Sequence, residues 1–264
     1  KKNISKLIGF GYRIIGPEIG EMACGEYGHG KMSEPLETIK YLNEYFTNLM
    51  NNSKLTALVT AGPTHEYIDP IRYMTNRSSG KQGYEIAKCL QEFGIETTLI
   101  TGPTNLSSLE GIKTIKVKSG EEMFKRTLEN LPSDIAIFSA AVSDWKVKNY
   151  SNTKIKKEND INLEFERNID ILNHVSNHNS LRPKIVIGFS AETNNLLKNS
   201  KVKIEQKNCD WIIANNVSDD SIGFESDYNE VTIFYKDKSS EKFPKMKKSL
   251  LAKRLVEKVI SQIN

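Results

Sequence analysis

The sequence predicts an α/β fold: a doubly wound, mostly parallel Rossmann-like sheet with helices on both faces and a C-terminal β-hairpin. From residue 55 onward, short apolar runs alternate with longer amphipathic segments. Such alternation is typical of strands and helices that wind around a parallel sheet. Near the C-terminus, the β-rich run 231–235 meets the turn residues Asp237-Lys238-Ser239, which favours a hairpin.

The elements of this sheet are expected in order along the main part of the chain. Gly94, for example, is a natural stop for a helix that carries Ile86, Leu90 and Phe93 on one face. Strands are predicted at residues 57–59, 97–101, 112–117, 135–138, 161–165, 185–189 and 211–214. Helices are predicted over 80–93, 119–131 (opened by a Ser119/Glu122 capping box), 169–178 and 194–207, and in a last segment with Leu251, Leu255, Val259 and Ile263 on one face.

Residues 1–50 differ in pattern and are expected to form a piece separate from the main domain at 51–264. A short strand at Ile14-Ile15, a Gly-rich loop over 22–32 and a helix from Ser33 to about residue 50 are predicted there. Ser33 suits the N-cap of that helix, because Pro35 and Glu37 follow it. The first residue is Lys1, and we expect a fragment of a longer protein.

Composition limits the classes of function. The 264 residues can bury a full core, and 38% are hydrophobic, 27% are charged and the net charge is +4. A duplex-binding face would carry a denser basic stripe, and no apolar run approaches the roughly 20 residues of a membrane helix, so neither nucleic-acid nor membrane partners are expected. Three scattered cysteines argue against a disulfide framework, and a cytoplasmic location is expected.

A strand, a long loop and a helix start come together between residues 57 and 83. The strand enters a turn at Gly62-Pro63, and the loop ends at Ser78-Ser79-Gly80 where the helix begins. Unpaired N–H groups and the helix dipole favour phosphate there, so we expect the floor of a nucleotide site. Neither a Walker loop nor a dinucleotide fingerprint fits, and Gly80 and Gly83 could instead merely allow a tight helix start.

Lysines supply candidate ligands for an anion. Lys203 and Lys207 are four residues apart on a predicted helix, so they share a face and could hold a triphosphate; a solvated helix face is the alternative. The polar loop 143–160 contains Lys154 among other lysines, and loops of this length are often functional, although a solvated charged loop is again the alternative. The four histidines lack metal-ligand spacing, and no protein metal site is predicted.

Three separated stretches resemble one family. Residues 60–64 with 68–72 and 75–81, residues 140–145 with 154–157, and residues 188–194 with 214–217 resemble bacterial phosphopantothenate-cysteine ligase. Residues 23–35 look like the tail of the phosphopantothenoylcysteine decarboxylase domain that bacteria commonly fuse in front of the ligase.

The resemblance implies a reaction and a set of substrates. CTP would activate 4′-phosphopantothenate to an acyl-cytidylate with release of pyrophosphate, and L-cysteine would then displace CMP to form the amide. Mg²⁺ would accompany CTP, held largely by phosphate oxygens and water. FMN would belong only to the decarboxylase domain of the full-length protein, with Cys24 matching its proton donor. The family is typically a homodimer through the ligase domain.

The resemblance also implies roles for individual residues. Asn76 and Arg72 would hold the acyl-cytidylate during attack by cysteine, and Lys154 would reach over the nucleotide from a mobile loop. Asp144 would contact the nucleotide, and Lys203 and Lys207 would bind its triphosphate. The remaining cleft residues implied by the resemblance or by the phosphate loop are Phe138, Ser139, Ala140, Asn168, Phe189, Ser78, Ser79 and Gly80.

Two rival functions stay open at this point. One is an NAD(P)-dependent oxidoreductase on the same fold, against which the missing glycine fingerprint counts. The other is a nucleotide-binding module without turnover.

Overall fold

The computed structural model describes residues 2–10, 12–22, 24–52, 54–156, 162–192, 196–216 and 226–263. It divides into two compact units, Lys1–Asn51 and Asn52–Asn264, which are taken one at a time. Among the described residues, no helix is both long and apolar enough to cross a membrane.

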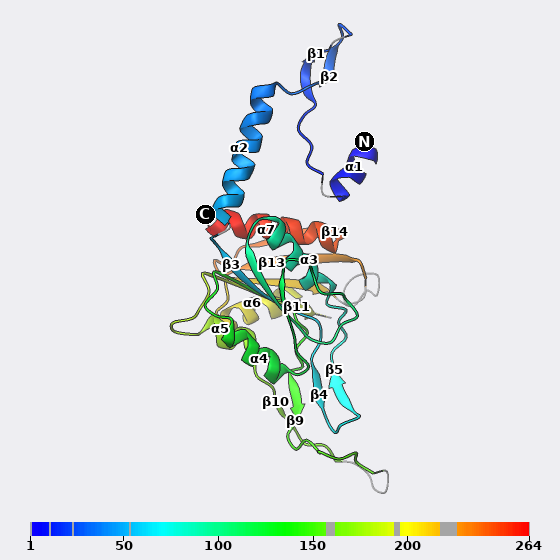
Figure 1. Ribbon diagram of the computed structural model, residues 1–264. Coiled ribbons are helices and arrows are strands. Elements are labelled where there is room, and N and C mark those ends of the chain that lie inside the picture. Colours follow the sequence, from blue (N-terminus) through cyan, green and yellow to red (C-terminus); the bar gives the residue numbers. More distant parts are fainter. Residues whose placement is uncertain are drawn as a thin grey trace. The chain divides into compact units, whose positions relative to one another are not determined.

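The first unit is built from helices and an antiparallel hairpin of strands (Figure 1). These are α1 (Lys2–Gly9), β1 (Glu18–Glu21) paired antiparallel with β2 (Tyr27–Lys31), and α2 (Pro35–Asn52). The predicted helix is confirmed, but it begins at Pro35, so Glu34 rather than the predicted N-cap Ser33 precedes it. The predicted strand at Ile14-Ile15 is wrong, because residues 12–17 have no regular structure. The segment predicted as a Gly-rich loop contains β2, which pairs with β1. The sequence of β2, Tyr-Gly-His-Gly-Lys, has no alternation of hydrophobic and polar residues, so its pattern did not indicate a strand.

The second unit is built on an eight-stranded sheet in the order β14-β13-β12-β11-β8-β3-β6-β7. Its six parallel strands have the doubly wound order 3-2-1-4-5-6, in which the direction of winding reverses between β3 and β8. An antiparallel hairpin of β13 and β14 extends one edge. The bounds are β3 (Thr56–Ala61), β6 (Glu96–Thr101), β7 (Lys113–Lys116), β8 (Ile135–Phe138), β11 (Ile185–Glu192), β12 (Trp211–Asn216), β13 (Tyr228–Tyr235) and β14 (Ser240–Lys247).

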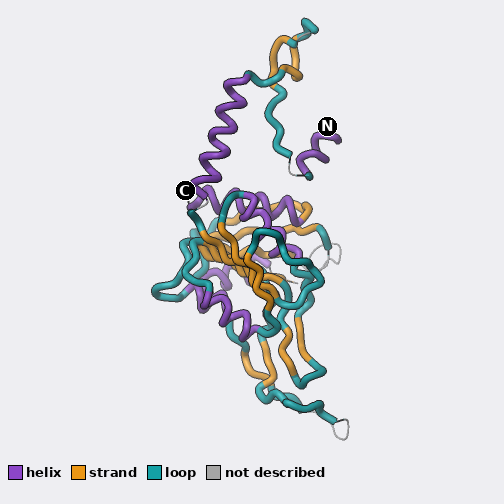
Figure 2. The backbone as a smooth tube through the Cα atoms, in the orientation of Figure 1, coloured by secondary structure: helices purple, strands orange, loops and turns teal. Residues whose placement is uncertain are grey.

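Helices cover both faces of this sheet, which confirms the predicted fold class (Figures 1 and 2). On one face α3 (Lys81–Glu92) and α7 (Lys248–Ile263) pack over Ala57 and Val59. On the other face α4 (Gly120–Glu129), α5 (Ile171–Ser176) and α6 (Leu196–Lys207) pack over Leu58 and its neighbours. Successive residues of β3 therefore enter different cores, as in a strand buried on both sides.

Two small antiparallel hairpins lie outside the main sheet. They are β4 (His65–Tyr67) with β5 (Tyr73–Thr75), and β9 (Trp145–Val147) with β10 (Phe165–Arg167). The sequence predicted only a polar loop over 143–160, so β9 is a correction, and the strand predicted at 161–165 begins at Phe165; residue 161 lies outside the described residues. Because Trp145 and Phe165 are both about half exposed, neither strand has the pattern of a core strand.

Local signals fixed several helix ends. Gly94 has φ 82 just after α3, as expected of a C-terminal stop. Ser119 caps α4 by accepting from the N–H of Glu122 at 3.2 Å. The Glu122 carboxylate accepts from the N–H of Lys118 at 2.8 Å, one residue before the partner that a capping box would give it.

Gly83 offers a test of how closely α3 approaches the sheet. A Cβ at this position would lie 2.5 Å from Ser139 Oγ and 2.6 Å from Ala61 Cβ. Helix propensity alone would make Gly83→Ala stabilising by roughly 0.5–1 kcal/mol, but we expect destabilisation by about 1–3 kcal/mol because the packed interface cannot accept the methyl group. Urea unfolding of wild type and of Gly83→Ala measures the change in the free energy of unfolding, with Lys88→Ala, at an exposed position of α3, as the control. A Gly83→Ala variant more stable than wild type would contradict the close packing of α3 on the sheet.

Candidate functional site

A cleft of about 1030 Å³ opens at the carboxyl ends of the parallel strands. Thr60 of β3, Phe138 of β8, Phe189 of β11 and Asn215 of β12 contribute to its wall. It therefore lies at the topological switch point between β3 and β8, where doubly wound sheets bind ligands. The predicted residues that line it are Asn76, Ser78, Ser79, Gly80, Phe138, Ser139, Ala140, Asp144, Asn168, Phe189, Lys203 and Lys207.

The start of α3 forms one wall of the cleft. Gly80 precedes the helix with φ 76, and no side chain of the described residues caps the helix. The N–H of Gly80 is held by Ser78 Oγ at 3.3 Å. Within the described part of the chain, the first turn of α3 thus begins at the cleft without a capping side chain, which suits an anion site. Gly83 lies close to β3, and Gly80 has a positive φ. The two glycines therefore also allow a tight helix start, which was the alternative interpretation of their positions.

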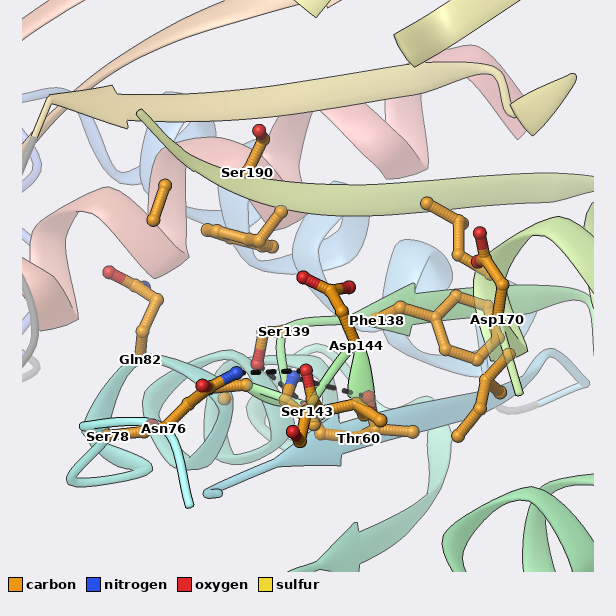
Figure 3. A pocket seen from close by; sticks show the side chains of 18 of the residues that line it. Thr60, Asn76, Ser78, Gln82, Phe138, Ser139, Ser143, Asp144, Asp170 and Ser190 are labelled. Atoms are coloured by element: carbon orange, nitrogen blue, oxygen red, sulfur yellow. Dashed lines mark hydrogen bonds between the residues drawn. The ribbon is translucent and has the colours of Figure 1, made fainter. Parts of the chain in front are cut away.

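The segment after β8 forms the opposite side of the switch point. Ser139 Oγ donates to the carbonyl of Thr60 at 2.8 Å, and the N–H of Ala140 reaches Thr60 Oγ1 at 3.4 Å. Asn76 Nδ2 donates to the carbonyl of Val142 at 3.0 Å. The Asp144 carboxylate points into the open space of the pocket, with Asn76 and Ser139 at its base (Figure 3).

Both candidate triphosphate lysines form ion pairs with carboxylates. Lys203 Nζ lies 2.6 Å from Glu192 Oε1 and 2.8 Å from Ser190 Oγ, and Lys207 Nζ pairs with Asp170. Glu192 is 8% exposed; burial raises the pKa of its carboxyl, but bonds from Lys203, Ser190 and Asn199 lower the pKa overall. The two cations of α6 are therefore held at the cleft by anions of the protein itself.

Asn168 brings a buried donor to the same cleft. Its Oδ1 accepts from the N–H of Ile169 at 2.9 Å, while its Nδ2 is buried and has no hydrogen-bond partner among the described residues. Its backbone N–H donates to the carbonyl of Asp144 at 2.8 Å, so the two candidate residues are directly linked. A buried amide without a partner is uncommon and suits a site that a ligand completes.

Three predicted residues do not line the cleft. Arg72 donates from Nη2 and Nε to Oδ2 of the fully buried Asp69, at 2.6 and 3.0 Å. Its Nη2 also donates to the carbonyl of Ile155 at 2.9 Å. The Arg72 guanidinium holds the pKa of the Asp69 carboxyl well below its usual range. Lys154, the neighbour of Ile155, is exposed, and Cys24 is an exposed thiol of the first unit.

Sequence reasoning missed two lysines of the cleft, Lys81 and Lys248. Lys248 begins α7 and is only 5% exposed, and Lys81 begins α3 and contacts Asp227 at 2.6 Å. Burial, together with the positive charge of Lys81, lowers the pKa of Lys248 from 10.5 to about 8. Lys247 and Lys248 are adjacent and chemically identical in the sequence, so nothing in the pattern marked the buried one.

The described residues were also considered as ligands for a metal ion. Among the residues that the structure describes, no three His, Cys, Asp or Glu side chains come together in a way that could hold an ion.

Comparison with known proteins gives the family. Residues 52–263 match the family described as the DNA/pantothenate metabolism flavoprotein C-terminal domain. The chain belongs to this family. It is 39% identical over 264 residues to the coenzyme A biosynthesis bifunctional protein CoaBC of Haemophilus influenzae, covering 99% of this chain and 65% of that protein. It is 40% identical to the protein of the same name from Borreliella burgdorferi, covering 97% of this chain and 65% of that protein.

A solved structure agrees with both the sequence and the fold. The crystal structure of the C-terminal domain of a coenzyme A biosynthesis bifunctional protein CoaBC is 32% identical, with a TM-score of 0.66, and covers 80% of this chain and 98% of that one. The expected relationship to this family and the Rossmann-like fold are thereby confirmed. The chain spans about two thirds of the length of the curated relatives it matches.

The buried charge of Lys248 predicts a pH-dependent effect on stability. The lowered pKa corresponds to a cost of roughly 3 kcal/mol for burying the charged form, so Lys248→Met should raise the free energy of unfolding at pH 7. As the pH rises through about 8 toward 10.5, the folded protein loses this proton before the unfolded chain does, and the cost disappears. Urea unfolding should show that the stability advantage of Lys248→Met over wild type becomes smaller as the pH is raised from 7. The exposed Lys247→Met is the control, and a gain independent of pH would contradict the assignment.

Proposed function

We propose that this chain is the ligase part of a coenzyme A biosynthesis enzyme that joins 4′-phosphopantothenate to L-cysteine with CTP. The observation that carries the proposal is the cleft itself: most residues that the resemblance assigns to the reaction line one pocket at the switch point of the sheet. The similarity to CoaBC proteins extends over 99% of the chain. The first unit would then be the end of a decarboxylase domain, with Cys24 as its proton donor and FMN bound by the remainder of that domain.

The first step would activate the acid. An oxygen of the pantothenate carboxylate attacks the α-phosphorus of CTP, the bond to the β-phosphate breaks, and pyrophosphate leaves. Since both reactants are anions, the site must neutralise charge and align them. Lys203 and Lys207 would pass from Glu192 and Asp170 to the triphosphate, and the first turn of α3 beside Ser78, Ser79 and Gly80 would take a further phosphate.

The second step would form the amide. The amine nitrogen of cysteine attacks the acyl carbon, CMP departs, and the nitrogen loses a proton. Asn76 lies at the base of the cleft beside Val142, where its amide could donate to the acyl group. Asp144 and Asn168 would contact the nucleotide, and Phe138, Ser139, Ala140 and Phe189 would form the walls around it.

Mg²⁺ is part of the nucleotide substrate in this proposal. The described residues include no grouped set of metal ligands, so phosphate oxygens and water would hold the ion, and no step is assigned to it. We further propose a homodimer formed through the ligase domain, and a cytoplasmic location.

Pyrophosphate release tests the function directly. The chain is incubated with 4′-phosphopantothenate and Mg²⁺ together with either CTP or ATP, before cysteine is added. Release that requires both the acid and CTP supports the acyl-cytidylate route and excludes a module without turnover. Binding of NAD(P)H together with absence of release would instead favour the oxidoreductase.

Lys154→Gln tests the segment between β9 and β10. We expect kcat/KM for CTP in pyrophosphate release to fall about tenfold to a hundredfold, the size of one lost charged hydrogen bond, with the free energy of unfolding unchanged because Lys154 is exposed. Lys148→Gln is the matched control, since the side chain of this exposed lysine pairs with Glu164 at 3.4 Å on the surface. Equal rates for Lys154→Gln and wild type would refute the role.

Asn76→Asp tests the second step. A carboxylate here would repel the cytidylate phosphate and could not donate to the acyl group, so we expect amide yield to fall more than pyrophosphate release. Single-turnover assays with both readouts separate the two steps. Asn76→Ala, which removes the donor without adding charge, should be less impaired; equal damage in both variants would show that charge is not the cause.

A further inference from the structure

Glu66 carries a buried carboxylate that the proposed reaction does not use. It lies in the middle of β4, in a small hairpin outside the main sheet, and yet it is only 5% exposed. A glutamate is seldom buried to this extent unless other groups compensate its charge. Its Oε1 accepts from the N–H of Gly120 at 2.9 Å, so the carboxylate lies at the start of α4, where the helix dipole favours a negative charge.

Gly120 is the point where Glu66 meets the wall of the cleft. A Cβ at this glycine would lie 2.8 Å from Asn168 Nδ2, 3.1 Å from Glu66 Oε1 and 3.3 Å from Val142 Cγ1. Asn168 and Val142 both line the cleft. The missing side chain of Gly120 therefore lets the carboxylate of Glu66 and the amide of Asn168 approach the same point.

The amide of Asn168 is held in one orientation. Its Oδ1 accepts from the N–H of Ile169 at 2.9 Å, which leaves Nδ2 on the side of Gly120 and Glu66. Nδ2 is buried without a hydrogen-bond partner among the described residues, so the attraction of Glu66 is electrostatic: a carboxylate attracts the donor end of an amide and repels its oxygen. Because the amide nitrogen carries two hydrogens, one can face Glu66 while the other remains for a ligand.

The position of Asn168 affects more than its own contact to a ligand. Asn168 begins the segment that leads to Asp170, which pairs with Lys207 and caps α5 by accepting from the N–H of Asn173 at 3.0 Å. The backbone N–H of Asn168 also donates to the carbonyl of Asp144 at 2.8 Å. A group that fixes Asn168 thus acts on several of the side chains that line the cleft.

We propose that Glu66 is a positioning residue for the nucleotide. Its carboxylate, fixed at the start of α4, orients the Asn168 amide so that a donor of that amide is available in the cleft. The inference rests on the proposed function in one respect, since the ligand that Asn168 would contact is CTP. Because Glu66 acts through Asn168, its effect on nucleotide binding disappears when the Asn168 amide is absent.

Calorimetric titration of the whole chain with CTP and Mg²⁺ tests this role without requiring turnover. Glu66→Gln, which keeps the shape of the side chain but removes the charge, should weaken CTP binding about threefold to tenfold and leave binding of 4′-phosphopantothenate unchanged. In an Asn168→Ala chain, the same substitution should cause no further loss. Glu122→Gln is the matched control, because this exposed carboxylate also lies at the start of α4, where it accepts from the N–H of Lys118 at 2.8 Å.

Three results would overturn the role of Glu66. These are unchanged CTP affinity of Glu66→Gln, a loss of equal size with and without the Asn168 amide, and an equal loss of 4′-phosphopantothenate binding. Pyrophosphate release by wild type with an unchanged KM for CTP in Glu66→Gln would reject the positioning role and leave the ligase standing. Coupling of Glu66 with Asn168 in CTP binding, without any pyrophosphate release, would reject the ligase and leave the positioning role standing. A wild-type chain that binds no CTP would reject both.

Discussion

The parallel pairing of β3 with β8 is the contact on which the cleft depends. Thr60 lies opposite Phe138 in the register of these strands, and beyond them the connections turn to opposite faces of the sheet. Thr60 also ties the two ends together, since its carbonyl accepts from both the N–H and the Oγ of Ser139, at 3.2 and 2.8 Å. Gly83 then lets α3 pack directly on this junction. The shape of the cleft thus follows from the backbone, and its chemistry from the side chains at the ends of the strands.

The cations of the cleft differ in how readily they can be transferred to a ligand. If Lys203 leaves Glu192, the carboxylate keeps the hydroxyl of Ser190 at 2.6 Å and the amide of Asn199 at 2.9 Å. Its buried charge therefore stays hydrogen-bonded, and a polyphosphate can take the lysine at moderate cost. Lys248 is a different case, because burial already disfavours its charged form, so an approaching anion would stabilise that form.

The sequence was sufficient for the fold and for the start of α3, but not for the charge pairs. Apolar alternation, Gly94 and Ser119 are local signals, and the right-handed crossover rule limits how the parallel strands can be connected. The pairs Lys203 with Glu192 and Lys207 with Asp170 join separate elements, and the burial of Lys248 depends on how α7 packs. β1, β2 and β9 were missed because strands outside a core carry no periodic hydrophobic pattern. Each of these features depends on contacts between residues far apart in the sequence, which a local sequence pattern does not show.

Arg72 shows how a residue outside the cleft can bear on the chemistry within it. Its guanidinium holds Asp69 and the carbonyl of Ile155, and Asp69 in turn accepts from the N–H of Ile155 at 3.2 Å. These contacts fix the backbone of the residue that follows Lys154. Asp69 also accepts two further N–H groups, from Ile71 and Arg72, so its charge would stay hydrogen-bonded if the guanidinium turned toward a ligand. The direct contact with an acyl-cytidylate that the family resemblance implies for Arg72 is therefore compatible with its support of the segment that carries Lys154, because the Asp69 carboxylate keeps other hydrogen bonds.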